Sequence, residues 1–472
     1  MLFPSNIFIF VFLPIVILLY YTIFKFKFKN FFLLIASLIF YGWGEPKFII
    51  IMIVSIFMNF IFGLLVDKFR KDEAKSRAIL IIMIALNISI LFIFKYLAFT
   101  ILNINLHGGY SLNIPDITLP IGISFFTFQA ISYVVDVYRN DGRVQKNPLN
   151  VALYISFFPQ LVAGPIVKYS TIDYEINNRK ETFQDFPIGV WRFIIGLSKK
   201  VLISNSMAII ADAAFNSIYN GISVSFAWLG AIAYTIQIFY DFSGYSDMAI
   251  GLGLMFGFHF DENFNYPYIS KTVSEFWRRW HISLGTWFKE YIYFPLGGSR
   301  VKSNDRKIVN LFAVWILTGI WHGANWTFVL WGLMYFVLIT VEKFTGFDKR
   351  SLKRKWINHV YTLSVVVIGW VIFRSNTISD AYIYLKSMIG IGANSIVDNI
   401  TIMYIKENIV FLISGVIFSM PVMGYLTQKI ESRKVSKILL EPISSIIVFI
   451  LFIVCITYLV KNTYNPFIYF NF

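Results

Sequence analysis

Cysteine is almost absent from this sequence, which has one cysteine, Cys455, among 472 residues. A single cysteine excludes an internal disulfide and a cluster of thiolate metal ligands. Cys455 also lies within the last long apolar run, where a reactive thiolate is not expected. Any catalytic chemistry must therefore come from other residue types.

Metal-binding and nucleotide-binding motifs are absent as well. The histidines at 107, 259, 281, 322 and 359 show neither H-x-x-x-H nor H-E-x-x-H spacing, and no carboxylates are paired with them locally. The chain has no G-x-x-x-x-G-K-[ST] loop, and "GLGLMFG" at 251–257 is typical of an apolar helix. We therefore expect no bound metal and no bound cofactor.

Charged residues are scarce too, at 14% of the chain, whereas 57% of the residues are hydrophobic. The mean hydropathy is +0.66, and a soluble globular protein is rarely so apolar. The sequence predicts an all-α polytopic membrane protein with about ten to twelve transmembrane helices plus re-entrant or interfacial helices. We expect a single integral-membrane domain over residues 1–472, since no long linker or repeat is visible. Long apolar runs occupy 6–24, 79–101, 358–373, 408–427 and 443–460.

The net charge of +15 does not indicate a nucleic-acid partner. The basic residues are gathered into short segments between apolar runs, as the positive-inside rule predicts for cytoplasmic loops of a multi-pass protein in the cell membrane. The first apolar run lacks a preceding positive region and a cleavage site, so we expect a retained span. The basic segments are 25–29, 67–77, 299–307, 349–355 and 429–437.

These segments predict part of the topology. If 25–29 and 67–77 both face the cytoplasm, "GWGEP" at 42–46 forms the turn of a helical hairpin between them. Two further spans are expected between 349–355 and 429–437, with the polar stretch 374–403 outside.

The segment "TGIWHGANWTF", 318–328, places His322 between two apolar runs that could form a hairpin with the histidine near its break. Ionisable residues at membrane depth are rare and usually line a pathway or site. A neutral imidazole can accept a proton from a hydroxyl that attacks a carbonyl, and Asn325 offers a nearby polar contact. The alternative is a hydrogen-bonded structural histidine.

The stretch 274–300, "SEFWRRWHISLGTWFKEYIYFPLGGSR", predicts a helix with a mixed face that has His281 at its centre. An interfacial amphipathic helix is the alternative description, although it does not account for the histidine. A third segment, "YDFSGYSD" at 240–247, places Asp241, Ser243 and Asp247 in an apolar region. This run either satisfies the backbone at a helix break or lines a cavity and orients substrate.

Four blocks, "FWRRWHISLGTWFKEYIYFPLGGSR", "FYDFSGYSDMAIGLG", "LTGIWHGANWTFVLWG" and the closing "NPFIYFNF", together resemble the membrane-bound O-acyltransferase (MBOAT) family, in its alginate O-acetyltransferase-like branch. The resemblance covers essentially the whole chain. It implies a helical fold around a central channel, in which an acyl group from a cytoplasmic thioester reaches a hydroxyl on the far side.

The resemblance also implies residue roles. His322 is expected to be the catalytic base and His281 its partner, with acetyl-CoA as the acyl donor. The expected acceptor is an extracytoplasmic polysaccharide. The expected partner protein is an SGNH-type secreted or membrane-anchored acetyltransferase. Basic residues at 278, 279, 289 and 300 could contact the donor phosphates. The residues expected to bind substrate are Trp277, Arg278, Arg279, Trp321, Asn325, Asp241 and Ser243.

Two alternatives remain open at this point. One is D-alanyl transfer to teichoic acid from a carrier-protein thioester, which shares the W-H-G block. The other is a transporter of lipid-linked polysaccharide, in which buried histidines relay protons. A transporter would be expected to show inverted or parallel repeats, and none is visible.

Overall fold

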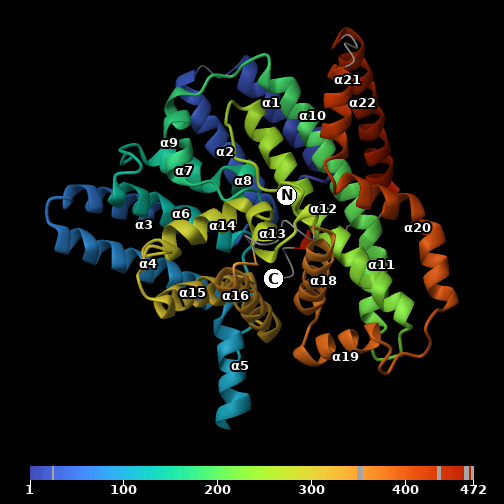
Figure 1. Ribbon diagram of the computed structural model, residues 1–472. Coiled ribbons are helices and arrows are strands. Elements are labelled where there is room, and N and C mark those ends of the chain that lie inside the picture. Colours follow the sequence, from blue (N-terminus) through green and yellow to red (C-terminus); the bar gives the residue numbers. More distant parts are fainter. Residues whose placement is uncertain (24–25, 163, 348–354, 433–436, 462–466, 469–472) are drawn as a thin grey trace. The chain divides into compact units, whose positions relative to one another are not determined.

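The computed structural model describes the chain except for residues 24–25, 163, 348–354, 433–436, 462–466 and 469–472 (Figure 1). The described residues form helices joined by turns and loops, and no strand occurs among them. The prediction of an all-α membrane fold is therefore confirmed.

The chain divides into two compact units, each described by itself below. Unit 1 comprises Met1–Phe193 and Met248–Asp261, and unit 2 comprises Ile194–Asp247 and Glu262–Phe472. The prediction of a single functional domain stays a prediction.

Unit 1 contains the helical hairpin predicted around "GWGEP". Helices α2 (Phe26–Gly44) and α3 (Ile49–Lys68) are joined by a turn at 45–48, which confirms that hairpin. A buried pair of amides, Asn59 on α3 and Asn87 on α4 (Glu73–Lys95), exchanges hydrogen bonds of 2.9 and 3.1 Å, so both polar groups are satisfied inside an apolar layer. The remaining helices of unit 1 include α1 (Leu13–Thr22), α4 (Glu73–Lys95), α5 (Leu97–Gly108), α6 (Ile123–Arg139), α7 (Pro148–Ser156), α8 (Phe158–Leu161) and α9 (Tyr169–Asn178).

Two helices pass from one unit to the other: α10 (Asp185–Ser198) and the 32-residue α12 (Val224–Met255). Unit 2 also holds the elements around the predicted histidines and several further helices. They are α11 (Asn205–Asn216), α13 (Val273–Arg279), α14 (Ile282–Phe288), α15 (Asn304–His322), α16 (Trp326–Thr345), α18 (Lys355–Arg374), α19 (Ile378–Met388), α20 (Asn399–Phe418), α21 (Val422–Ser432) and α22 (Lys437–Lys461).

Seven helices of the described chain are long and apolar enough to cross a membrane, and two shorter apolar helices, Phe8–Thr22 and Phe28–Gly44, accompany them. Two of the seven, Lys355–Arg374 and Asn399–Phe418, are the pair expected between the last two basic segments. The expected total of about ten to twelve spans is larger than this number. Helix α15 is not among the seven, and its first turn contains the charged residues Asp305, Arg306 and Lys307.

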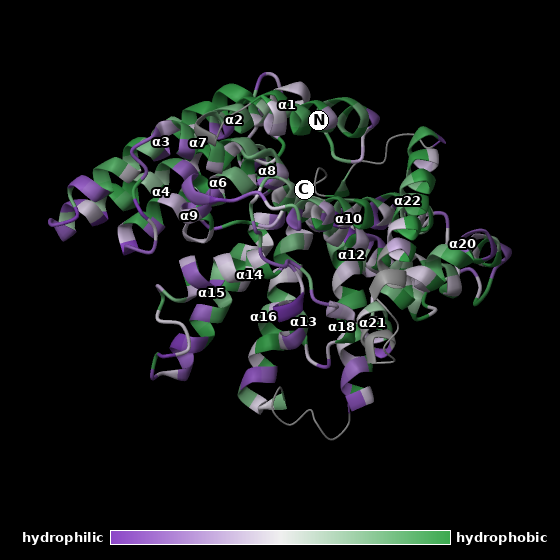
Figure 2. Ribbon diagram, turned by 90° about the horizontal axis from the view of Figure 1, so that it is seen from above, coloured by the Kyte–Doolittle hydropathy of each residue, from purple (hydrophilic) through white to green (hydrophobic). Residues whose placement is uncertain are grey.

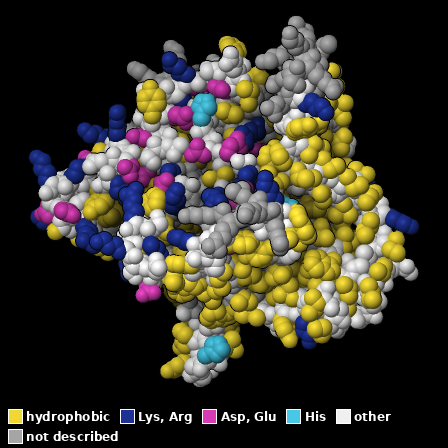
Figure 3. All heavy atoms as spheres, in the orientation of Figure 1, with side chains coloured by type: hydrophobic (Ala, Val, Ile, Leu, Met, Phe, Trp, Pro, Cys, Tyr) yellow, Lys and Arg dark blue, Asp and Glu magenta, His cyan; other side chains and the backbone are white. Residues whose placement is uncertain are grey.

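The surfaces of these helices fit a bilayer. Hydrophilic residues gather at one end of α15, α16 and α18, whereas hydrophobic residues follow most of their length (Figure 2). Hydrophobic side chains cover the part of unit 2 that contains α11, α19 and α20 (Figure 3). Apolar surface of this extent is expected where lipid is the solvent.

Candidate active site

The helical hairpin α15–α16 positions His322. Helix α15 ends at His322, and α16 begins at Trp326 after the N-cap Asn325, so the predicted hairpin with the histidine at its break is confirmed. The two helices approach closely at two glycines. A Cβ on Gly319 would lie 2.5 Å from the Phe328 carbonyl oxygen, and one on Gly332 would lie 2.5 Å from the Trp315 carbonyl oxygen.

His322 is buried within an aromatic shell. Its ring lies 5.0 Å from Trp321 and 5.1 Å from both Trp331 and Phe373, measured between ring centroids. Its side chain is nearly inaccessible, at 6% exposure. The shell is built by α15, α16 and α18 together, and it holds the imidazole edge-on against large rings.

His281 lies at a helix break, and the expectation of one helix across 274–300 is wrong. Helix α13 ends at Arg279 and α14 starts at Ile282. His281 itself has φ 44° and ψ 54°, a left-handed conformation that residues other than glycine rarely adopt. The mixed helical face predicted around His281 therefore does not exist, because the chain changes direction at that residue.

The two histidines contact the same tryptophan. The Trp321 ring lies 6.4 Å from His281 and 5.0 Å from His322, and both contacts are edge-on with an interplanar angle of 69°. His281 also lies 6.2 Å from Phe242 of α12 and 6.2 Å from Phe264. Burial lowers the pKa of His281 well below its ordinary value, so its ring is neutral near pH 7. The structure thus brings both predicted histidines into one buried aromatic site.

Asp241 and Ser243 lie on α12 beside this site. Asp241 is fully buried and forms an ion pair of 2.5 Å with the Lys200 ammonium. It also accepts hydrogen bonds from the Ser204 hydroxyl, at 3.1 Å, and from the Ile468 backbone N–H, at 2.8 Å. These contacts anchor two other segments to α12, and a contact between Asp241 and substrate stays a prediction.

Ser243 differs from Asp241. Its side chain is 2% exposed, and its hydroxyl makes no hydrogen bond within the described part of the chain. A buried hydroxyl without a partner is uncommon and is available to a polar ligand. Ser243 follows Phe242, whose ring contacts His281.

The remaining predicted substrate residues are placed as follows. Trp277 packs among Trp331, Tyr335 and other rings, and its indole N–H is buried without a hydrogen-bond partner among the described residues. Asn325 caps α16 and donates to the Asn376 carbonyl at 2.7 Å. Arg279 pairs with Glu275 at 3.0 Å, whereas Arg278, Lys289 and Arg300 are exposed.

Glu342 is a site-building residue that the sequence reasoning missed. It lies on α16, is 2% exposed, and accepts hydrogen bonds from the Val273 N–H (2.7 Å), the Ser274 N–H (2.8 Å) and the Ser274 hydroxyl (2.7 Å). Its carboxylate thus satisfies the first turn of α13. The first half of helix α16 therefore packs on His322. The last part of α16 holds α13, the helix that leads to His281.

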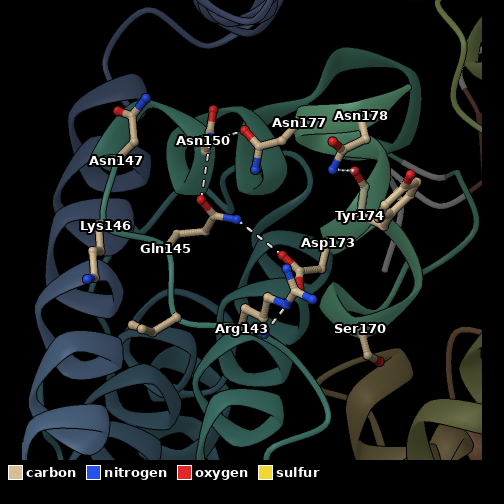
Figure 4. Close-up of a pocket in the computed structure, with 11 residues that line it drawn as sticks. Arg143, Gln145, Lys146, Asn147, Asn150, Ser170, Asp173, Tyr174, Asn177 and Asn178 are labelled. Carbon is tan, nitrogen blue, oxygen red and sulfur yellow. Dashed lines mark hydrogen bonds between the residues drawn. The ribbon is translucent and has the colours of Figure 1, made fainter. Parts of the chain in front are cut away.

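A separate polar pocket of about 550 Å³ lies in unit 1, between the segment 143–147, the start of α7, and α9 (Figure 4). A network of side-chain hydrogen bonds joins the buried Gln145 and Asn150 to the exposed Asn177 and to Asp173. Asn150 donates to Gln145 at 3.2 Å and to Asn177 at 2.9 Å, and Gln145 donates to Asp173 at 3.2 Å. These groups satisfy one another, and Arg143 and Lys146 at its rim are exposed.

Metal ligands do not cluster in the described residues: no group of three or more His, Cys, Asp or Glu side chains there could hold an ion. The expectation that the chain binds no metal stays a prediction. The chemistry available at the histidine site is proton transfer and hydrogen bonding.

Comparison with known proteins decides the family. The model of the membrane-bound O-acyltransferase (MBOAT) family matches residues 143–375, a range that includes both histidines. A probable alginate O-acetylase AlgI of Pseudomonas putida is 40% identical over 396 residues, which cover 83% of this chain and 81% of that protein. The chain belongs to the MBOAT family.

Other MBOAT-type relatives act on different polymers. A peptidoglycan O-acetyltransferase of Helicobacter pylori is 36% identical over 434 residues, covering 84% of this chain and 81% of the relative. A teichoic acid D-alanyltransferase of Bacillus subtilis is 32% identical over 264 residues, covering 52% and 65%. The chain is therefore a multi-pass membrane O-acyltransferase, which decides against the transporter alternative.

Proposed function

We propose that this MBOAT protein takes an acetyl group from cytoplasmic acetyl-CoA and delivers it across the cell membrane for O-acetylation of an extracytoplasmic polysaccharide. The observation that carries the proposal is the placement of His281 and His322 against one buried tryptophan, within the range that matches the family. Relatives named for O-acetylation of alginate and peptidoglycan support an acetyl group and a polysaccharide acceptor.

His322 acts as the general base in this proposal. It accepts the proton of the acceptor hydroxyl while the hydroxyl oxygen attacks the thioester carbonyl carbon. An ester bond forms, the C–S bond breaks, and the leaving thiolate takes up the proton from the imidazolium to give free thiol. A positioned base of this kind contributes about 10²–10⁴-fold in rate.

His281 orients the reacting groups or shares the transferred proton. Its neutral state supports either role, because a neutral imidazole can both donate and accept a hydrogen bond. The aromatic shell excludes water, which disfavours hydrolysis of the thioester and strengthens each hydrogen bond to the reacting atoms. The hydroxyl of Ser243 and the indole N–H of Trp277, which have no hydrogen-bond partner among the described residues, are candidates for contacts with substrate.

Acetyl-CoA is large and anionic, so its nucleotide stays on the cytoplasmic side while its pantetheine arm carries the acetyl group inward. Arg278 is the candidate for phosphate contact that the geometry favours over Arg279, because Arg279 is already paired with Glu275. The acceptor hydroxyl belongs to the polysaccharide itself or to an SGNH-type partner that completes the transfer.

Acetate released by mild alkali from the cell-surface polysaccharide tests the proposal. Cells carrying His322→Ala are expected to lose the acetate while keeping normal amounts of membrane-inserted protein, because only the base is removed. His107→Ala, an exposed histidine on α5, is the matched control and should retain full acetylation. Unchanged acetylation in the His322→Ala strain would refute the assignment.

D-alanyl transfer to teichoic acid is a second candidate, which the Bacillus subtilis relative favours. That match covers a smaller share of this chain than the acetyltransferase matches do. Ester-linked D-alanine and acetate measured from the same wall preparation, with and without the gene, separate the two. Loss of D-alanine alone would replace the acetyl proposal.

A further inference from the structure

We propose that Asn263 is a positioning residue for His281: it fixes the neutral imidazole with its proton on Nδ1 and leaves Nε2 as the nitrogen that can accept a proton. The catalytic use of Nε2 rests on the proposed function. The tautomer itself does not.

The orientation of the Asn263 amide is determined by its partners. Its Oδ1 accepts from the Ser283 backbone N–H at 3.1 Å and from the Ser283 hydroxyl at 2.9 Å. A backbone N–H can only donate, so the oxygen must lie on that side of the amide. The Nδ2 group donates to the Ser246 hydroxyl of α12 at 2.9 Å. Both ends of the amide therefore have suitable partners in this orientation, and a flipped amide would lose them.

His281 faces the acceptor end of this amide. Its Nδ1 lies 3.3 Å from Asn263 Oδ1. Because Oδ1 cannot donate, Nδ1 must carry the proton of that hydrogen bond. A neutral ring with Nδ1 protonated has a lone pair on Nε2. The hydrogen bond made by one ring nitrogen commonly sets the tautomer of a histidine, and here Asn263 sets it through Nδ1.

Asn263 also holds the unusual backbone at His281. Its carbonyl oxygen accepts from the Ile282 N–H at 2.9 Å, so both its backbone and its side chain bind the two residues that follow the histidine. Left-handed backbone at a residue other than glycine persists where surrounding contacts enforce it, and such sites cluster at functional positions. The segment "YDFSGYSD" thus acts on His281 through Ser246 and Asn263.

The nearby charged residues are paired with one another, so Asn263 is the residue that selects the tautomer of His281. On α12, Asp241 is neutralised by Lys200, and on α13, Arg279 is paired with Glu275. The rings that contact His281 are uncharged, and His322 lies across Trp321 from it.

Nitrogen NMR of the ¹⁵N-histidine-labelled protein in detergent micelles tests the tautomer directly. The chain has five histidines, and the His281 signals are assigned by their loss in His281→Gln. The inference predicts a protonated Nδ1 and an unprotonated Nε2 that do not change between about pH 6 and 8, since burial lowers the pKa of His281. A protonated Nε2, or an imidazolium in this range, would overturn it.

Two substitutions extend the test to turnover. Asn263→Ala removes the acceptor and is expected to lower kcat about tenfold or more while leaving the KM for acetyl-CoA unchanged. Asn263→Asp keeps an acceptor but adds a negative charge beside Nδ1, which raises the pKa of His281. Since His281 must be neutral to accept a proton, the acidic limb of the pH–rate profile then moves to higher pH, and activity recovers as pH rises.

Asn265→Ala is the matched control, because Asn265 is exposed and its contacts with Arg279 involve its backbone groups. A pH–rate profile of Asn263→Asp that coincides with that of the wild type would count against the inference. The NMR result does not depend on the reaction, so a wrong tautomer with intact His322-dependent acetylation overturns only this inference. The predicted tautomer without any acetyl transfer overturns only the proposed function.

Discussion

The histidine site of unit 2 and the polar pocket of unit 1 are opposites in their polarity. The histidine site is lined by Trp321, Trp331 and Phe373, and it holds buried polar atoms that have no partner in the described chain, such as the Trp331 indole N–H. The pocket is lined by amides that already bind one another, with its cations exposed at the rim. Buried polar groups that have no partner among the described residues are available for a substrate, whereas groups that already bind one another gain little from one.

The largest expected effect is at the two histidines. His281→Ala and His322→Ala should each lower the acetylation rate by about 10²–10⁴-fold. Because the two rings share one site, the double variant should be little worse than the more severe single variant. Steady-state rates of the three purified variants measure this, and fully additive losses would show that the histidines act independently.

Breaking the buried ion pair next to the site should destabilise unit 2. Lys200→Met leaves Asp241 buried and unpaired, which costs about 3–5 kcal/mol. The matched control is Lys199→Met, because the Lys199–Asp247 pair is partly exposed and should matter less. Thermal denaturation in detergent compares the two variants, and equal midpoints would contradict the importance of burial here.

The hairpin that carries His322 is sensitive to one added methyl group. Gly319→Ala places a Cβ against the Phe328 carbonyl and should cost about 1–3 kcal/mol by forcing α15 and α16 apart. Gly424→Ala is the control, since nothing lies within 4 Å of an added Cβ there. If both variants keep wild-type stability and activity, the close helix contact does not position the histidine.

The smallest effect is expected in the polar pocket. Arg143→Ala and Lys146→Ala remove exposed cations that make no ion pair with the described residues, so stability should change by less than about 0.5 kcal/mol. Acetylation kinetics should also be unchanged. A raised KM for acetyl-CoA in these variants would show that the pocket binds the acyl donor. The contrast between the two regions would then not hold.

The sequence predicted the parts of this site that depend on local pattern. His322 falls at the break of a hairpin because two apolar runs flank it, and the structure has that hairpin. The break at His281 was missed because the residues around it are compatible with a helix. The left-handed turn depends on hydrogen bonds to Asn263, which lies 18 residues earlier in the chain. Glu342 was missed for the same reason, since its partners are 68 and 69 residues away.

The most direct test of the central claim is acetyl transfer by the purified protein in vesicles. Labelled acetyl-CoA is supplied on one side and a hydroxyl acceptor on the other, and acetyl ester is measured for the wild type, His322→Ala and His107→Ala. The account predicts ester formation with the wild type and His107→Ala, and none above background with correctly folded His322→Ala. Ester formation by His322→Ala at the wild-type rate would contradict it.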